Sequence, residues 1–151
     1  MQHYQNILAA VDFSAHSQQA LVRAKEMAEL HSAKLKVIHV TELPSYPVLE
    51  DIAITGLPGI WGDDLADKLH QVSQTKLNKL VQAVGIDPIC CEVVVGIAKQ
   101  DIVKQAELVN ADLIIIGRRG LSVIQRLIGS TADAVLHQAH CDVLAVNLGE
   151  D

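Results

Sequence analysis

The fold of this chain is decided by the stretch ADLIIIGRRG at residues 111–120. Four consecutive aliphatic residues, Leu113 to Ile116, stand between an aspartate and a glycine. Such a run is typical of a strand buried on both faces of a parallel sheet. Similar runs, the last of which is expected at a sheet edge, predict further strands at residues 7–11, 35–40, 89–95 and 143–146.

Helical patterns separate the predicted strands. Apolar residues recur three and four positions apart, and a serine, Ser14 or Ser17, is the expected N-cap of the first helix. The expected helices run from that serine to about residue 31, over residues 63–84, near 102–109 and near 132–136. Strands and helices thus alternate along the chain. This order predicts an α/β fold, a doubly wound parallel sheet with helices on both faces.

The length of 151 residues is typical of one domain, and we expect a single domain over residues 1–151. Hydrophobic residues make up 50% of the chain but aromatic ones only 3%, so we expect an aliphatic core. Prolines and glycines interrupt residues 41–62, which predicts a long irregular loop. A functional lid, a dimer contact and a mobile excursion remain open alternatives for this loop.

The charge and the first residues of the chain disfavour several classes of partner. A formal net charge of −6 and an isoelectric point near 5.6 disfavour nucleic acid, because a polyanion requires clustered lysines and arginines. The apolar run at residues 7–11 ends at Asp12 and is too short for a signal peptide or a membrane span. We therefore expect a cytoplasmic protein without a membrane partner. Cys90, Cys91 and Cys141 lack zinc-site spacing and are expected to be reduced thiols.

Residues that follow the predicted strands are candidates for ligand binding, since open α/β sheets bind ligands beyond the carboxyl ends of their strands. Gly117 and Gly120 follow one strand, and Gly129 to Thr131 open the last helix. Glycines let backbone amides approach an anion and a helix N-terminus adds free N–H groups, so this segment is a candidate phosphate site. The alternative is that the glycines only form a turn and Ser130 only caps the helix. Neither Gly-x-x-x-x-Gly-Lys-Ser/Thr nor Gly-x-Gly-x-x-Gly occurs, which disfavours P-loop hydrolysis and dinucleotide binding.

Several of these segments together resemble the universal stress protein family. The segments are ILAAVDFS at residues 7–14, LKVIHV at 35–40, ADLIIIGRRG at 111–120, the pair Gly129-Ser130, and CDVLAV at 141–146. Each segment alone is a weak sign of the family, but the order and separations of the segments are specific to it. The resemblance covers essentially the whole chain. The resemblance implies a five-stranded sheet in the order 3-2-1-4-5.

The resemblance also implies a site for an adenine nucleotide, ATP or AMP. Nucleotide-binding members of the family carry Gly-x2-Gly-x9-Gly-Ser/Thr, which falls here on Gly117, Gly120, Gly129 and Ser130. This chain has eight residues instead of nine between Gly120 and Gly129. The shorter spacing bears on the course of the loop and on the number of phosphates that it holds.

The same resemblance implies that Asp12 lies beside the nucleotide and contacts it through the ribose or through a magnesium ion bound to the phosphates. Val40 receives a main-chain contact with the adenine edge, and Arg118 or Arg119 is a candidate phosphate ligand. An alternative for Asp12 is a charge that favours the start of the following helix. The complete set of candidate nucleotide-binding residues is Ala10, Val11, Asp12, His39, Val40, Ile116, Gly117, Arg118, Arg119, Gly120, Gly129, Ser130 and Thr131.

These inferences predict an adenine-nucleotide-binding stress-response protein that acts as a nucleotide-dependent switch or sensor. A homodimer is expected through the C-terminal strand, at residues 142–148, and no catalytic residue is assigned. One alternative is a slow ATPase or autophosphorylating enzyme, with Asp12 holding magnesium and Ser130 or Thr131 near the γ-phosphate. A second alternative is a dimeric interaction module that does not bind nucleotide, as in one branch of the family.

Overall fold

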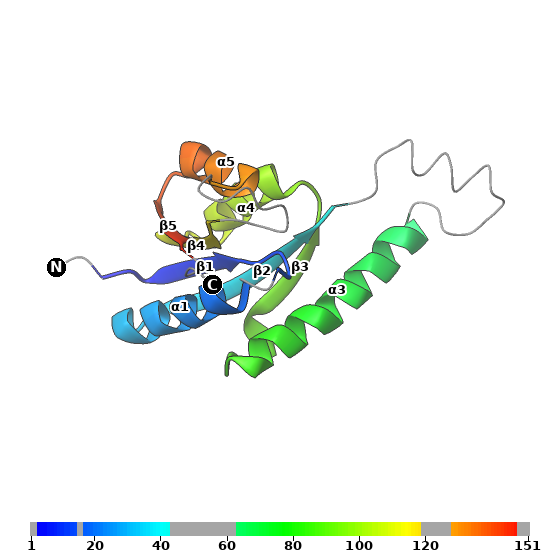
Figure 1. Ribbon diagram of the computed structural model, residues 1–151, viewed down its shortest axis with the longest axis horizontal. Coiled ribbons are helices and arrows are strands. Elements are labelled where there is room, and N and C mark those ends of the chain that lie inside the picture. Colours follow the sequence, from blue (N-terminus) through cyan, green and yellow to red (C-terminus); the bar gives the residue numbers. More distant parts are fainter. Residues whose placement is uncertain (1–2, 15–16, 43–62, 119–127, 148–151) are drawn as a thin grey trace.

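The computed structural model of the chain describes residues 3–14, 17–42, 63–118 and 128–147 (Figure 1). Thr41 ends a strand, and residues 43–62 of the predicted loop lie outside the described residues. The elements are, in chain order, β1 (Asn6–Ala10), α1 (Ser17–His31), β2 (Lys34–Thr41), α3 (Asp63–Ala83), the 3-10 helix η1 (Pro88–Cys90), β3 (Cys91–Val95), α4 (Ala98–Leu108), β4 (Leu113–Gly117), α5 (Ser130–Gln138) and β5 (Asp142–Val146).

The five strands form one sheet in the order β3-β2-β1-β4-β5, and every pairing is parallel. The predicted strand order and the edge position of β5 are both confirmed. Ala10 of the central strand β1 is paired with Ile38 of β2 and with Ile116 of β4. The chain adds β2 and β3 on one side of β1 and then β4 and β5 on the other, so the winding reverses between β1 and β4.

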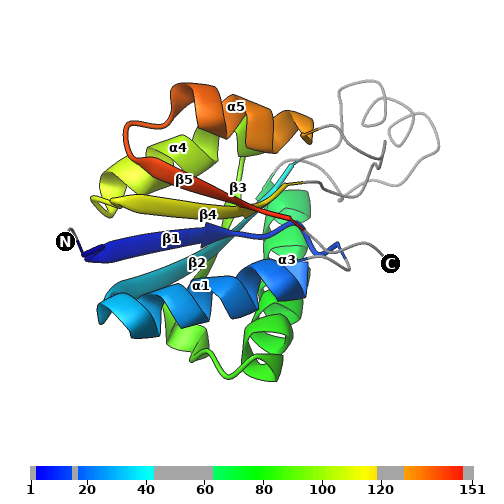
Figure 2. The same cartoon turned by 60° about the vertical axis from the view of Figure 1, so that its left-hand side comes forward.

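Two layers of helices cover the sheet, as Figure 2 shows: α1 and α3 lie on one face, and α4 and α5 lie on the other. Successive side chains of a strand point to opposite faces, and β1 divides its residues accordingly. Ile7 and Ala9 pack in the core under α1 and α3, whereas Leu8 and Ala10 pack under α4 and α5. The buried hydrophobic residues are aliphatic in both layers, as the composition predicts.

The predicted strand at residues 89–95 begins later than expected, at Cys91. The side chain of Asp87 accepts the N–H of Ile89 at 3.0 Å, and the Asp87 carbonyl accepts the N–H of Cys90 at 3.0 Å. Pro88 fits the first position of the resulting helical turn, because its missing N–H is not needed there. This local capping removes Ile89 and Cys90 from the strand.

The helices follow the predicted pattern with different ends. The first helical residue of α1 is Ser17, so neither predicted serine, Ser14 or Ser17, is its N-cap, and α4 begins at Ala98, ahead of the apolar residues that marked it. Within the described ranges, no helix combines the length and the apolar character needed to cross a membrane.

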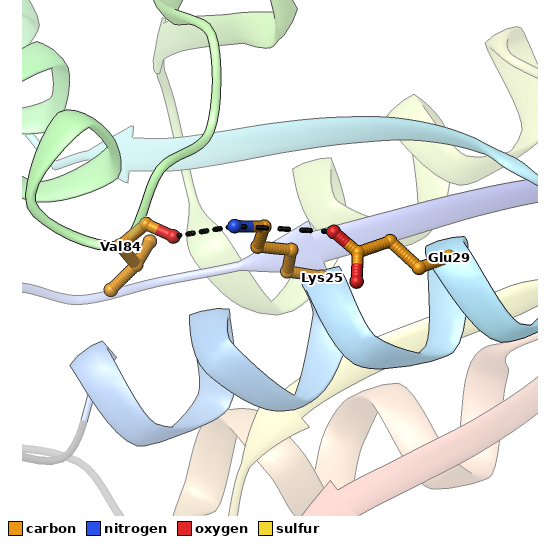
Figure 3. A network of polar contacts seen from close by, with 3 residues as sticks. All are labelled: Lys25, Glu29 and Val84. Atoms are coloured by element: carbon orange, nitrogen blue, oxygen red, sulfur yellow. Dashed lines mark hydrogen bonds and ion pairs between the residues drawn. The ribbon is translucent and has the colours of Figure 1, made fainter.

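Lys25 connects α1 to the end of α3 (Figure 3). Its Nζ donates to the carbonyl oxygen of Val84 at 3.3 Å and lies 3.9 Å from Glu29 Oε1. Gly85 follows with φ of 78°, in the left-handed region that commonly ends a helix. A cation at a helix C-terminus also interacts favourably with the helix dipole, so Lys25 stabilises the contact between the two helices.

Candidate functional site

The carboxyl edge of the sheet, defined here as the edge at which β1, β2 and β4 end, brings together the predicted site residues that the structure describes. Because Ala10 is paired with Ile116, the chain leaves β1 at Val11 beside the point where it leaves β4 after Gly117. In Figure 2, β1 and β4 end toward the right, where α5 also begins above the sheet and α1 begins below it. Residues far apart in the sequence therefore become neighbours where the winding reverses.

Asp12 follows β1 and is anchored through one carboxylate oxygen. Its Oδ1 accepts the N–H of Ser14 at 3.0 Å and the hydroxyl of Ser17 at 2.9 Å. The N–H of Asp12 donates to the same Ser17 hydroxyl oxygen at 3.2 Å. These bonds agree with the alternative interpretation, in which Asp12 supports the start of α1. They involve only Oδ1, and Oδ2 accepts no hydrogen bond from the residues that the structure describes.

Phe13 adopts a backbone conformation that the sequence did not predict. Its φ is 63°, in the left-handed region, where a bulky residue costs on the order of 1–3 kcal/mol. The Phe13 ring lies against the imidazole of His39, with 4.0 Å between centroids and 32° between planes. An aromatic pair contributes about 0.5–1.5 kcal/mol, so this contact offsets part of the strain.

His39 also contacts the main chain of Val11, the residue that follows β1. Its Nδ1 lies 2.7 Å from the carbonyl oxygen of Val11. Burial lowers the pKa of His39, and the nearby Lys76 acts in the same direction, whereas the bond to Val11 and the charge of Asp12 oppose them. Burial is the largest of these effects and favours the neutral imidazole.

Val40 presents main-chain groups beyond the end of β1. Backbone groups of successive strand residues face alternate neighbours; the Ile38 carbonyl faces β1, where it accepts the N–H of Val11 at 3.0 Å. The Thr41 carbonyl faces β3, where it accepts the N–H of Gly96 at 3.0 Å. The N–H and C=O of Val40 therefore face the β1 side, and β1 pairs no further than Ile38.

Two main-chain bonds hold Arg118, the residue with which the connection from β4 to α5 begins. Arg118 donates its N–H to the carbonyl of Val146 at 2.9 Å, and its own carbonyl accepts the N–H of Gly129 at 2.8 Å. This second bond brings Gly117 and the start of α5 to the same place. Arg119 and Gly120 of the predicted set lie outside the described residues, as do residues 121–127.

The start of α5 contradicts part of the alternative interpretation, in which Ser130 only caps the helix. Gly129, with φ of −60° and ψ of 150°, is the N-cap, and Ser130 is the first helical residue, so the idea that Ser130 caps the helix is wrong. Glycine has no side chain to cap the helix, no other side chain of the described residues accepts a hydrogen bond there, and Asp133 donates the first helical bond, to the Gly129 carbonyl at 2.9 Å. The N–H groups of Ser130 and Thr131 therefore have no partner within the helix, which is the arrangement that binds anions.

The described part of the chain contains no group of three or more histidine, cysteine or acidic side chains that could hold a metal ion. Asp12 is therefore not part of a ready-made metal-binding cluster among the described residues. A magnesium ion at this position therefore requires further ligands from a bound phosphate or from water.

The strand order, with the winding reversed between β1 and β4, is that of a doubly wound α/β protein. The model of the universal stress protein family matches residues 3–147, and the chain belongs to this family.

Relatives and solved structures agree with this membership. Universal stress protein A homolog 2 of Coxiella burnetii is 38% identical over 150 residues, and the match covers 98% of each chain. The structure of universal stress protein UspA from Lactobacillus plantarum has a TM-score of 0.68 and 26% identity, covering 97% of this chain and 99% of the other. A universal stress protein in complex with cAMP has a TM-score of 0.62 and 28% identity, covering 98% and 100% of the two chains.

Proposed function

We propose that this chain binds an adenine nucleotide, ATP or AMP, at the carboxyl edge of its sheet. The observation that carries the proposal is the meeting of three segments where the winding reverses: Asp12 after β1, Gly117 at the end of β4 with Arg118 after it, and the first turn of α5. The bond from Gly129 to Arg118 holds the last two segments together at 2.8 Å.

The phosphates lie against the start of α5 in this proposal. The N–H groups of Ser130 and Thr131 point out of an N-terminus that carries no side-chain cap, and the helix dipole favours negative charge there. Asp133 in the same turn adds a negative charge, so the arginines that precede the helix are needed to balance it. Arg118 supplies one of them, and Arg119 and Gly120 join the site through the family motif.

The adenine lies toward β2, where the Val40 main chain offers a donor and an acceptor to its edge. Ala10, Val40 and Ile116 belong to the same core cluster, on the face of α4 and α5, and are buried. An aliphatic surface with main-chain polar groups suits a planar base in a protein that has few aromatic residues. A relative 28% identical to this chain has been solved in complex with cAMP, itself an adenine nucleotide, which supports this choice of ligand.

Magnesium enters the proposal only together with the phosphates. Mg²⁺ is commonly bound by one or two carboxylates plus phosphate oxygens and water, and Oδ2 of Asp12 suits that role. The remaining oxygen, Oδ1, keeps Asp12 in place through Ser14 and Ser17.

Isothermal titration of nucleotide-free protein with ATP, AMP and cAMP, with GTP as the control, tests the proposal. We expect saturable binding of ATP or AMP and weaker binding of GTP, because the Val40 main chain reads the adenine edge. Absence of heat at millimolar ATP and AMP would contradict the proposal and leave the interpretation as a non-binding interaction module. Hydrolysis that persists in pure protein and disappears in Asp12→Ala would add the ATPase alternative.

The same proposal makes this protein a cytoplasmic, homodimeric switch or sensor whose state depends on the bound nucleotide. β5 is the edge strand beyond β4, and Val143, Leu144 and Ala145 are only partly buried in one copy of the chain. Pairing with a second copy would satisfy this edge and cover those side chains. Sedimentation velocity with and without ATP tests the dimer and its dependence on nucleotide. We expect a dimer whose sedimentation coefficient changes with nucleotide, and a monomer at high protein concentration would contradict the proposed dimer.

A further inference from the structure

His39 belongs to the predicted nucleotide-binding residues, but its imidazole lies behind the candidate site rather than inside it. Its strand neighbours Ile38 and Val40 pack under α4 and α5, so the imidazole points to the opposite face, where it meets Phe13. Lys76 of α3 is on the same side, with its Nζ 5.9 Å from the centre of the Phe13 ring. The imidazole of His39 therefore contacts the residues that follow β1 on the face of the sheet that α1 and α3 cover.

Through the contact of His39 with Val11, β2 also binds the residue that follows β1. β1 ends at Ala10, yet the next residue is still fixed by both of its main-chain groups. The Val11 N–H donates to the Ile38 carbonyl at 3.0 Å, and the Val11 carbonyl is 2.7 Å from Nδ1 of His39. Because a carbonyl oxygen only accepts, Nδ1 carries the proton and Nε2 does not in the neutral ring.

Phe13 is the second point of contact. Its φ of 63° is a conformation that phenylalanine rarely adopts, and its ring rests on the imidazole at 4.0 Å between centroids. His39 thus contacts the residue before Asp12 and the residue after it. The conformation of Asp12 is fixed from both sides by one side chain.

The consequence falls on the Asp12 carboxylate. With Val11 and Phe13 held, Oδ1 reaches Ser14 at 3.0 Å and Ser17 at 2.9 Å. Oδ2 then remains without a hydrogen-bond donor from the described residues, at the edge where the nucleotide is proposed to bind.

We propose that His39 is a positioning residue, which holds residues 11–13 in the conformation that presents the Asp12 carboxylate to the nucleotide. This inference rests on the proposed function, since it assigns no direct contact between His39 and the ligand. The charged groups that face the ring are Asp12 from the β1 exit and Lys76 from α3. A neutral ring suits the role, because the Nδ1–H donor is all that the Val11 carbonyl needs.

The test compares His39→Leu, which removes the donor and the ring, with His39→Asn, whose amide nitrogen can replace the Nδ1–H donor. We expect ATP affinity to fall about tenfold in His39→Leu and to recover to within about threefold of the wild type in His39→Asn. Phe13→Leu keeps His39 and removes the ring contact; we expect about a threefold loss. His31→Leu, the same change at a histidine distant from the site, is the matched control and should bind ATP as the wild type does.

A second readout does not depend on nucleotide. The Ser14 amide donates to Asp12 Oδ1, so its hydrogen exchange in ligand-free protein reports the conformation of the segment. We expect the fastest exchange in His39→Leu, a smaller and similar increase in Phe13→Leu and His39→Asn, which both lose only the ring contact, and wild-type exchange in His31→Leu. Wild-type affinity and unchanged Ser14 exchange in folded His39→Leu would overturn the inference. If the wild type itself bound no nucleotide, the proposed function would fail, while the exchange data would still decide whether His39 positions the segment.

Discussion

The two edges of the sheet use the same residue types in different ways. At the amino edge, where the strands begin, Asp112 accepts the N–H groups of Gln5 at 2.7 Å and Asn6 at 3.0 Å. Tyr4 donates its hydroxyl to Asp142 at 2.8 Å, and this bond raises the pKa of Tyr4. The carboxylates of the amino edge are thus paired within the chain, and their effect is on stability.

The carboxyl edge also has paired carboxylates, since Glu42 accepts the N–H of Ala98 at 3.0 Å and Asp12 accepts two donors, but it uses fewer of its polar groups. The Asp12 carboxylate uses only one of its oxygens toward the described residues, and the N-cap of α5 is Gly129, which has no side chain to cap the helix. Polar groups that a protein does not satisfy internally remain available to water or to a ligand. The amino edge therefore stabilises the sheet, whereas the carboxyl edge keeps polar groups for the ligand that we propose.

The largest expected effect comes from placing a negative charge at the start of α5. Ser130→Asp should lower ATP affinity about a hundredfold, because unit charges about 5 Å apart repel by about 3 kcal/mol at an effective dielectric constant of about 20. The same change should leave the stability unchanged or raise it by about 0.3–1 kcal/mol, since the helix dipole favours an acid there. Titration calorimetry and urea unfolding measure the two effects. Ser130→Asn is the uncharged control. If Ser130→Asp bound ATP as tightly as the wild type, the phosphates would not lie at this helix.

The next effect is at the amino edge and has the opposite character. Asp112→Ala should lower the free energy of unfolding by about 1–2 kcal/mol, because two main-chain N–H groups lose a charged acceptor that is partly exposed. ATP affinity should not change. Urea unfolding and calorimetry again provide the measurements, with Asp112→Asn as the control that keeps one acceptor oxygen. A loss of ATP affinity in the folded variant would show that the edges are coupled.

A smaller effect concerns Cys91, which begins β3 at the amino edge. Burial raises the pKa of its thiol from 9.0 to about 11, which reduces the reactive thiolate at pH 8 about a hundredfold. The greater nucleophilicity of a high-pKa thiolate returns about a factor of ten, so alkylation should be about tenfold slower than in unfolded protein. Mass spectrometry of the Cys91 peptide after a timed iodoacetamide reaction measures the rate. Equal rates in folded and urea-unfolded protein would contradict the burial of this thiol.

The smallest effect is the pH dependence that His39 adds at the carboxyl edge. Its pKa in the folded chain is below the ordinary 6.5, so the unfolded chain binds this proton first as the pH falls. The contribution of His39 to stability is therefore present above pH 6.5 and decreases below it. Between about pH 7.5 and about pH 5.5, the wild type should lose more stability than His39→Asn in urea unfolding. An equal loss in the two proteins would show that His39 is not buried neutral, and His31→Asn controls for a general histidine effect.

Local patterns predicted most of the fold and named the residues at the strand ends. They were wrong for residues 89 and 90, because the Asp87 cap and Pro88 favour a helical turn over the strand that Ile89 and Cys90 suggested. Periodicity measures burial, and it does not register a capping bond. The left-handed conformation of Phe13 had no signal either, since phenylalanine is among the residues that least favour it.

The sequence by itself determined the elements, the two-faced burial of the strands and the candidate residues after β1, β2 and β4, because these follow from patterns that extend over a few neighbouring residues. Only the tertiary structure decided how those residues meet. The bonds from Gly129 to Arg118 and from His39 to Val11 depend on which strands are neighbours and on where each strand ends. Both Asp12 and Asp112 are carboxylates beside strand ends in the sequence, and only the positions of the parallel strands decide that both oxygens of Asp112 but one of Asp12 accept donors from the described residues.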